Sequence, residues 1–458
     1  MGWVEQELDG IDLKDARLEN RLQKLIEQFS ERPGASIPKA CEDWAGAKGA
    51  YRFFDNPKVS HRAIMDSHRQ ATVERVEQEE LVLVLQDTTS LDFSHHPETV
   101  GLGPLENPRQ QGMLLHSSLA VSEAGVPLGI LDQQVWRRDP AQVGQRHRRK
   151  ERPIEEKESY KWLKGLDNST RNLACDICVV SVADREADVY ELFQAAGEDK
   201  KYLVRAAWNR HLDSQEPDYL WQAVRQAPLA GALVVEVGRG KDHPPREATL
   251  SVRFTQVTLR PPRRPTGQTG LRPLRLYALE AFEENPPPDQ EPLHWLLLTN
   301  VPVRTLADAQ RCLRWYALRW LVERFHFVLK SGCRIEARQL ATADRLERLA
   351  AVFSVVAWRL LWLTYQGRVT PDAPCTLALQ THEWQALYAF VHRSPDLPAE
   401  PPSLAQAVQW IAQLGGFLNR KSDGMPGVKV LWLGWQRLQD IADTWLFTHP
   451  PPDLPRCG

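Results

Sequence analysis

The chain lacks the segments that mark membrane-spanning or exported proteins. Its most apolar stretch, residues 349–363, is short for a bilayer span and contains Arg359, so it indicates a buried core helix. The N-terminus, which begins Met1-Gly2-Trp3, has no apolar leader region. We therefore expect a cytoplasmic protein.

Cysteine is scarce and irregularly placed. The seven cysteines are odd in number and scattered, which argues against a disulfide framework and agrees with a reducing compartment. Cys175 and Cys178 form one CxxC pair, but no second pair lies at zinc-binding spacing. Core cysteines of a strand are the favoured interpretation of this pair, and a zinc site is the alternative.

A strong net charge is also absent. The 458 residues hold 57 Lys and Arg against 59 Asp and Glu, a net charge of −2, which excludes a uniformly basic nucleic-acid coat. The charge is nevertheless uneven, because residues 1–80 hold 12 basic and 16 acidic residues whereas residues 201–275 hold 13 and 6. With 42% hydrophobic and 25% charged residues, the chain has the composition of a globular protein of several domains.

Three regions differ in their hydrophobic periodicity. Residues 1–72 carry apolar residues at helical spacing, and residues 369–458 are helical again. Residues 73–368 mix strands with helices, and the apolar run Leu81–Leu85 predicts a strand covered on both faces. Alternation of apolar and polar residues predicts an antiparallel β insertion at about 232–292. The fold class is therefore α/β, with helical domains at both ends.

The last helical region carries a large apolar stripe. Such a stripe is either core or an interface between two copies, and the sequence alone leaves both interpretations open. Its members are Trp435, Leu438, Ile441 and Trp445.

Two aspartates follow apolar runs that predict strands. Asp87 comes after Leu81–Leu85, and Asp184 comes after residues 179–183. Ligand sites of open α/β sheets gather at the carboxyl ends of strands, and carboxylate oxygens suit Mg²⁺. The plainer interpretation is that each aspartate caps a strand-to-helix turn.

A third carboxylate lies on a predicted helix over about 306–331. Tyr316, Arg319, Glu323, Phe327 and Lys330 are spaced by three or four residues and so share one helix face. The rest of this helix is strongly apolar, which favours a functional site on the charged face. A solvated ladder of ion pairs is the alternative.

The spacing of these residues resembles a known signature. Tyr316, Arg319, Glu323 and Lys330 match the Y-(2)-R-(3)-E-(6)-K signature of the insertion-sequence-four family of bacterial transposases. The surroundings of Asp87 (Gln-Asp-Thr-Thr-Ser) and Asp184 (Asp-Arg-Glu-Ala-Asp) resemble the acidic motifs of the family. Further resemblance lies in residues 50–57, which are similar to its DNA-end-binding domain, and in residues 414–417, which are similar to its C-terminal domain.

The resemblance implies a fold and a chemistry. It implies a ribonuclease-H-like catalytic domain over residues 73–368, a DNA-end-binding domain over 1–72 and a dimerisation domain over 369–458. Asp87, Asp184 and Glu323 fall on the catalytic DDE triad, which would hold two Mg²⁺ ions, with Mn²⁺ as a substitute. Two such ions clamp the attacking and leaving oxygens of an in-line phosphoryl displacement.

The resemblance also assigns DNA contacts. Tyr316, Arg319 and Lys330 are expected to contact phosphates of the transposon end, and Trp295 to stack on a flipped base. A buried strand aromatic is the alternative for Trp295. The remaining expected DNA contacts are all arginines: Arg185, Arg205, Arg210, Arg21 and Arg52.

The expected function is cut-and-paste DNA transposition with hairpin formation by a homodimer, acting in a bacterial cytoplasm in association with the nucleoid. The partners are double-stranded DNA ends and target DNA, with no membrane. The alternatives are a metal-dependent nuclease of the same fold that does not join ends, and an inactive DNA-binding regulator. The acidic balance of residues 1–80 departs from the basic character usual for a DNA-binding domain.

Overall fold

The computed structural model describes residues 2–142, 152–174, 176–213, 216–237, 246–263, 270–288, 290–421 and 423–450. Cys175 lies outside these residues. In the described part of the chain, no helix is both long and apolar enough to cross a bilayer.

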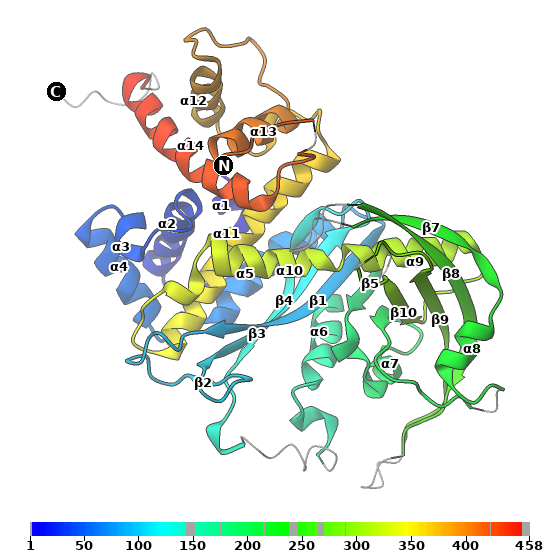
Figure 1. The fold of residues 1–458 in the computed structure, drawn as a ribbon. Coiled ribbons are helices and arrows are strands. Elements are labelled where there is room, and N and C mark those ends of the chain that lie inside the picture. The colour runs from blue at the N-terminus through cyan, green and yellow to red at the C-terminus, as the bar shows by residue number, and fades with distance from the viewer. Residues whose placement is uncertain are drawn as a thin grey trace.

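A mixed β-sheet forms the centre of the molecule (Figure 1). Its strand order is β2-β3-β1-β5-β6-β10-β9-β8-β7, with β4 paired to β3. β1 is parallel to β5, and β5 is parallel to β6, while the other pairs are antiparallel. The strands are β1 (Leu81–Asp92), β2 (Gly103–Pro104), β3 (Gln111–Ser122), β4 (Pro127–Trp136), β5 (Cys178–Ala183), β6 (Lys201–Arg205), β7 (Leu229–Val237), β8 (Arg246–Leu259), β9 (Leu274–Glu283) and β10 (His294–Thr299).

The strands expected as an insertion extend this same sheet. β9 (Leu274–Glu283) pairs with β10, and β8 and β7 follow outward, so the sheet continues without a break into the region of residues 229–283. β1 lies between β3 and β5 in the sheet. Two helices, α6 (Tyr160–Thr170) and α10 (Trp320–Phe327), pack against β1. Strand residues alternate between faces, which explains why a strand covered on both faces is apolar at every position from Leu81 to Leu85.

Five helices form the N-terminal region, and the expected helical character of residues 1–72 agrees with them. Polar caps start three of the helices: Asp15, Asp43 and Ser60 each accept a hydrogen bond from a backbone N–H of the first turn. The second helix buries Leu22, Leu25, Ile26 and Phe29, as its spacing predicts. The helices are α1 (Trp3–Glu7), α2 (Ala16–Glu31), α3 (Ile37–Ala40), α4 (Trp44–Asp55) and α5 (His61–Val76).

The helix expected over about 306–331 is divided into three pieces. α9 (Leu306–Leu318) begins at a capping box formed by Thr305 and Asp308, and α10 begins after Arg319. A π-helical segment, Val328–Gly332, then follows. The other helical segments before α11 (Ala343–Val369) in the described residues are short: Pro140–Gln142, Ile154–Glu156, Arg185–Ala187, α7 (Tyr190–Ala196), α8 (Leu220–Gln226) and Ile335–Ala337.

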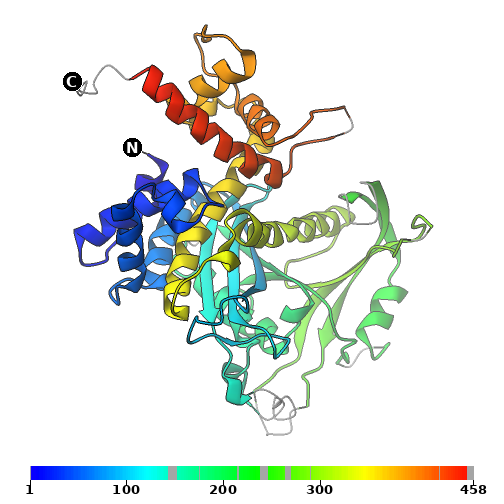
Figure 2. The ribbon, with the colours of Figure 1, turned by 60° about the vertical axis from the view of Figure 1, so that its left-hand side comes forward.

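The longest helix joins the three regions. α11 (Ala343–Val369) packs against α2, α4 and α5, against β4, and against α13 and α14. Figure 2 shows it running from beside the N-terminal helices into the C-terminal ones. Arg359, which interrupts its apolar sequence, lies over the rings of Trp3 and Trp362, at 5.0 and 4.1 Å from the ring centroids. The helix is therefore the buried core helix that its composition indicates.

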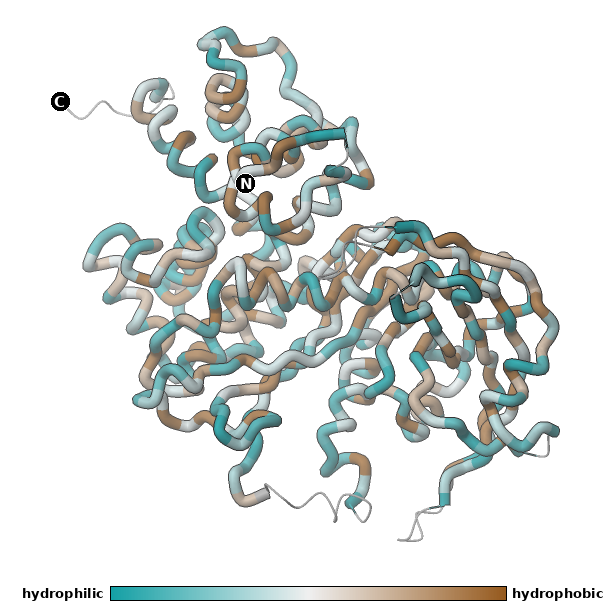
Figure 3. Tube along the Cα trace, viewed as in Figure 1, coloured by the Kyte–Doolittle hydropathy of each residue, from teal (hydrophilic) through white to brown (hydrophobic). Residues whose placement is uncertain are grey.

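The C-terminal helices are α12 (Thr381–His392), α13 (Leu404–Leu414) and α14 (Val428–Thr448), preceded by the short turn Cys375–Leu377. α13 and α14 approach so closely that a Cβ added to Gly434 would lie 1.7 Å from the carbonyl oxygen of Ile411. In Figure 3 hydrophobic and hydrophilic residues alternate along these helices, as expected for helices with one buried face.

The N-terminal and C-terminal helical regions are in contact. Arg32 at the end of α2 forms ion pairs with Asp440 and Asp443 of α14, at 3.9 and 3.2 Å, and Trp435 Nε1 donates to the carbonyl oxygen of Ser30. Trp435 and Leu438 are buried within the chain, so this half of the apolar stripe is core. Ile441 and Trp445 are half-buried.

A buried polar cluster fixes the first helix to the rest of the molecule. The Glu7 carboxylate of α1 contacts His68 Nδ1 and accepts two hydrogen bonds of 3.0 Å from Arg75, both of α5. His68 Nε2 in turn accepts a hydrogen bond of 3.0 Å from the backbone N–H of Ile130 on β4. Burial alone would raise the pKa of Glu7, but His68 and Arg75 outweigh it and lower this pKa to about 2.

We expect Glu7→Gln to destabilise the protein, because it leaves Arg75 and His68 without their anionic partner. A carboxyl group whose folded pKa is about 2 and whose unfolded pKa is 4.5 stabilises the fold above pH 4.5, by about 3 kcal/mol. That contribution is lost as the pH falls from 4.5 towards 2. Chemical denaturation at pH 7 should show the loss in the variant. Between pH 4.5 and 2 the variant should lose stability less steeply than the parent, and equal slopes would contradict the assignment.

Candidate active site

Asp87 and Asp184 lie on neighbouring parallel strands. Leu85 of β1 is in register with Val182 of β5, so the same register brings Asp87 level with Asp184 two residues later. Asp87 does not follow the end of its strand, as the sequence suggested, because β1 continues to Asp92 in pairing with β3. It lies where the parallel neighbour β5 ends. Asp184 does cap the next turn, since it accepts a hydrogen bond of 2.9 Å from the N–H of Glu186.

The two carboxylates influence each other electrostatically. Burial raises the pKa of Asp184, and the negative charge of Asp87 raises it further. Two carboxylates in this arrangement repel each other, so a positive charge placed between them is stabilised. The donor set of Asp87 and Asp184 is therefore chemically suited to a divalent cation.

The third candidate ligand, Glu323, lies on α10, which packs against β1 and β3. Its carboxylate accepts a hydrogen bond from Arg319, four residues earlier, and its side chain is 53% exposed. Burial would lower the pKa of Arg319, but Tyr316, Glu323 and Asp87 together raise it. Arg319 thus lies in the electrostatic field of all three candidate carboxylates, because its charge also acts to lower the pKa of Asp184.

The structure brings the three carboxylates to one region without forming a closed ligand cluster. In the described ranges, no three His, Cys, Asp or Glu side chains form a group that could hold a metal ion as they stand. Arg319 forms an ion pair with Glu323, as expected for residues four apart on a helix, and the metal-binding role of Glu323 stays a prediction.

His326 is a residue that the sequence analysis missed. Its Nδ1 lies 3.4 Å from Asp87 Oδ2, and its Nε2 lies 3.2 Å from the hydroxyl oxygen of Ser117 on β3. Gln133 Nε2 of β4 donates to the same hydroxyl oxygen at 3.2 Å. If the Ser117 hydroxyl donates to Nε2, the ring proton is on Nδ1 and faces Asp87. The signal in the sequence was its position three residues after Glu323, on the same side of the helix.

Tyr316 and Trp295 are in contact with each other. Their rings lie edge to face with centroids 5.4 Å apart. Tyr316 is 5% exposed and belongs to the core, whereas Trp295, on β10, is half-buried. Trp295 is thus a half-buried strand aromatic that packs on Tyr316, and its stacking on a flipped base stays a prediction.

Lys330 lies in the π-helical segment and is engaged within the chain. Its Nζ donates to the carbonyl oxygen of Ser90 on β1 at 2.9 Å and lies 3.0 Å from Glu336 Oε1. The segment therefore places the lysine beside the strand that carries Asp87. A phosphate at this position would compete with Glu336 for the ammonium group.

The three arginines near β5 and β6 differ in their environments. Arg185 follows Asp184 and is exposed. Arg205 ends β6 and donates to the carbonyl oxygen of His294 at 2.7 Å. Arg210 is paired with the buried Asp188, to which its Nε donates at 3.0 Å, so its guanidinium stabilises the loop.

The two arginines expected in the N-terminal domain lie on different helices. Arg21 of α2 is half-buried and packs over Gly49 of α4, where an added Cβ would lie 2.7 Å from the Arg21 Cζ atom. Arg52 of α4 is exposed. Trp44, at the start of the same helix, is 78% exposed.

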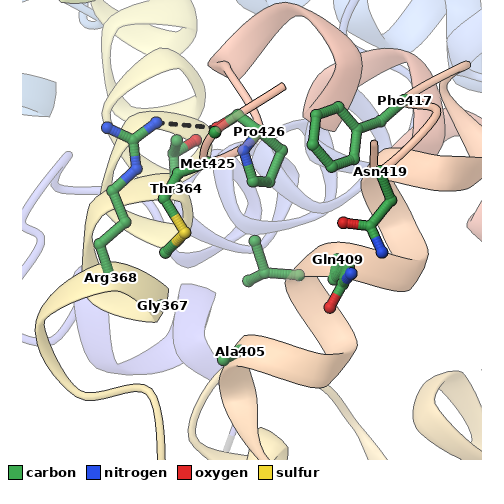
Figure 4. Close-up of a pocket in the computed structure, with 11 residues that line it drawn as sticks. Thr364, Gly367, Arg368, Ala405, Gln409, Phe417, Asn419, Met425 and Pro426 are labelled. Atoms are coloured by element: carbon green, nitrogen blue, oxygen red, sulfur yellow. Dashed lines mark hydrogen bonds between the residues drawn. The ribbon is translucent and has the colours of Figure 1, made fainter. Parts of the chain in front are cut away.

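A pocket lies away from the carboxylates, among the C-terminal helices (Figure 4). Its volume is about 200 Å³, and Arg368 of α11 closes one side by donating to the carbonyl oxygen of Pro426 at 2.8 Å. Phe417, Asn419 and Met425 of the loop before α14 also line it. The pocket holds no candidate catalytic residue.

Two protein-family models match the chain, and both describe domains of transposases. The model for a transposase DNA-binding domain matches residues 1–59, and the model for the Tn5 transposase dimerisation domain matches residues 355–447. The helical N-terminal region, the large mixed sheet and the helical C-terminal region agree with a transposase architecture. More particularly, the chain is Tn5-like, with a transposase DNA-binding domain at one end and a Tn5-type dimerisation domain at the other.

Proposed function

We propose that this chain is a DNA transposase that binds the inverted repeats at transposon ends, cleaves them, forms hairpins and joins the ends to target DNA. The single observation that carries the proposal is the placement of Asp87 and Asp184 side by side on β1 and β5, with Glu323 on the helix packed against β1. This constellation lies between a matched DNA-binding domain and a matched dimerisation domain.

We assign the catalytic domain to the ribonuclease-H-like fold. The assignment is supported by the order β4-β3-β1-β5-β6, in which an antiparallel meander is followed by two strands parallel to β1. We propose the domain bounds 1–72, 73–368 and 369–458. α11 crosses the last of these bounds by a single residue, so the dimerisation domain is anchored on a helix that begins in the catalytic domain.

Asp87, Asp184 and Glu323 would hold two Mg²⁺ ions, for which Mn²⁺ would substitute. Bound there, the ions would supply Lewis-acid activation of the attacking hydroxyl and stabilisation of the leaving oxygen. The neighbouring residues have separate tasks. His326 orients the Asp87 carboxylate, Arg319 balances the charge of Glu323 and Asp87, and Lys330 offers its ammonium group to a DNA phosphate beside β1.

The proposal is tested with the full chain and DNA that carries the repeats flanking its coding sequence. Incubation with Mg²⁺ should give nicks at the repeat ends, then hairpins, then joined products. Nicks without hairpins or joining would favour a nuclease of the same fold. Binding without any cleavage would favour an inactive regulator, and the absence of binding would contradict the proposal as a whole.

We expect Trp295→Ala to slow hairpin formation more than the first nick. A flipped base needs a stacking partner only when the 3′-hydroxyl attacks the opposite strand, and one stacking contact is worth about 1–3 kcal/mol, or roughly tenfold to a hundredfold in rate. Time courses that resolve nicks from hairpins measure the difference. Trp295→Phe should retain most of the rate. Equal slowing of both steps would instead indicate a packing defect transmitted through Tyr316.

A further inference from the structure

An exposed tryptophan follows strand β6. The Trp208 side chain is 65% exposed, although its backbone is firmly held. Its N–H donates to Asp188 Oδ2 at 3.0 Å, and the N–H of Ala207 donates to the same oxygen at 2.7 Å. Asp188 is buried and also accepts from Arg210. The loop therefore presents the ring to solvent on a fixed backbone.

The loop lies at the same edge of the sheet as the carboxylates. β5 and β6 are parallel, with Ala183 in register with Val204, so Asp184 and Arg205 lie level where the two strands end. Asp188, which holds the Trp208 backbone, is only four residues after Asp184. The N–H of Ala206 donates to the carbonyl oxygen of Leu296 at 2.7 Å, which joins the loop to the strand of Trp295.

The charge balance of the sequence around this loop favours a polyanion. Arg185 is exposed on the neighbouring turn, and residues 201–275 hold 13 basic against 6 acidic residues. Arg210 is engaged by Asp188, so within this loop the arginine serves to build the structure and Trp208 is the group that is presented. An exposed aromatic ring on a fixed backbone is the arrangement that proteins use to stack on unpaired bases.

We propose that Trp208 is a DNA contact that stacks on an unpaired base next to the strand being cleaved or joined. This inference rests on the proposed transposase function and adds to it a second stacking position besides Trp295. The ligand is a base freed from its partner, in either the transposon end or the target DNA. Every base offers a π-face, so the contact selects for unpaired structure and is tolerant of sequence.

The test compares Trp208→Ala, Trp208→Phe and the parent as full-length proteins. Fluorescence anisotropy measures their affinity for two duplex probes, one with the end repeat and one with unrelated target sequence. Each probe is prepared fully paired, with a short unpaired thymine tract, and with abasic sites in place of those thymines. We expect Trp208→Ala to lose roughly tenfold in affinity for thymine-tract DNA. It should lose little for the paired or abasic probes, and Trp208→Phe should retain most of the affinity.

Phe390→Ala is the matched control, because Phe390 is 48% exposed on α12 in another domain. Its affinities should equal those of the parent. The probe that shows the loss identifies the source of the base as end or target. Equal loss on paired, abasic and thymine-tract probes, or no loss on any of them, would overturn the inference. Failure of the parent to bind the end repeat would instead overturn the proposed function, so the two failures are distinguishable.

Discussion

Glu323→Ala should abolish DNA nicking and joining while leaving binding of the transposon end almost unchanged. A metal ion stabilises the charge of a phosphoryl-transfer transition state by several kcal/mol, so the loss of one ligand should slow cleavage roughly a thousandfold or more. The side chain is 53% exposed and packs little, so its removal should not unfold α10. Cleavage and gel-shift assays on the same preparation measure the two effects.

The structure adds a reason to expect slightly tighter binding by this variant. Glu323 accepts a hydrogen bond from Arg319, and its removal frees that guanidinium for a DNA phosphate. Asp87→Asn and Asp184→Asn should likewise fail in cleavage and still bind. Titration of the DNA-free protein with Mn²⁺, monitored by its melting temperature, gives a readout that does not depend on activity. All three variants should show a smaller rise in melting temperature than the parent.

Lys330→Ala is a control for Glu323→Ala, because it should change DNA binding, which Glu323→Ala should leave almost unchanged. Removal of a lysine that contacts one phosphate should reduce the slope of log K for DNA binding against log[salt] by about one unit. Glu336→Gln should tighten binding, because Glu336 holds Lys330 in the free protein. If Glu323→Ala cleaves at a rate near that of the parent in Mg²⁺, the metal assignment is wrong and its pair with Arg319 is only structural.

Negative charges introduced on one side of α14 should prevent the pairing of two DNA ends. Leu433 and Phe447 are 41% and 87% exposed, and their spacing of fourteen residues places them on the same side of the helix. Because residues 355–447 match a dimerisation domain, we expect these two exposed apolar side chains to meet a second copy. The double variant Leu433→Glu, Phe447→Glu should lose paired-end complexes by roughly thirtyfold or more, while one-end binding persists.

The structure favours surface substitutions over removal of the whole region. Truncation after Gly367 would expose core residues of α11 that α13 and α14 cover, and it would remove the ion pairs of Arg32 with α14. Leu377→Glu is a matched control, since Leu377 is 49% exposed in the same domain but outside α14. Native gels with labelled ends separate the complexes. Normal paired-end complexes in the double variant would show that the interface lies elsewhere.

Local patterns in the sequence were sufficient for the secondary structure of the core. The run Leu81–Leu85 is apolar at every position because both faces of β1 are covered, and the stripe Leu22 to Phe29 is buried as its helical spacing requires. The charged face bearing Arg319 and Glu323 was also visible, since residues four apart on a helix are neighbours whatever surrounds them. The helical ends of the chain followed from the same periodicity.

Only the tertiary structure decided which partners the polar and charged side chains have. Arg210 pairs with Asp188, Lys330 lies beside Ser90 and Glu336, and Trp435 donates to Ser30, 405 residues away in the chain. Such choices depend on segments distant in sequence, and periodicity says which face of an element is buried without naming what covers it. For the same reason the sequence left the apolar stripe of α14 open between core and interface, and packing against α2 placed Trp435 in the core.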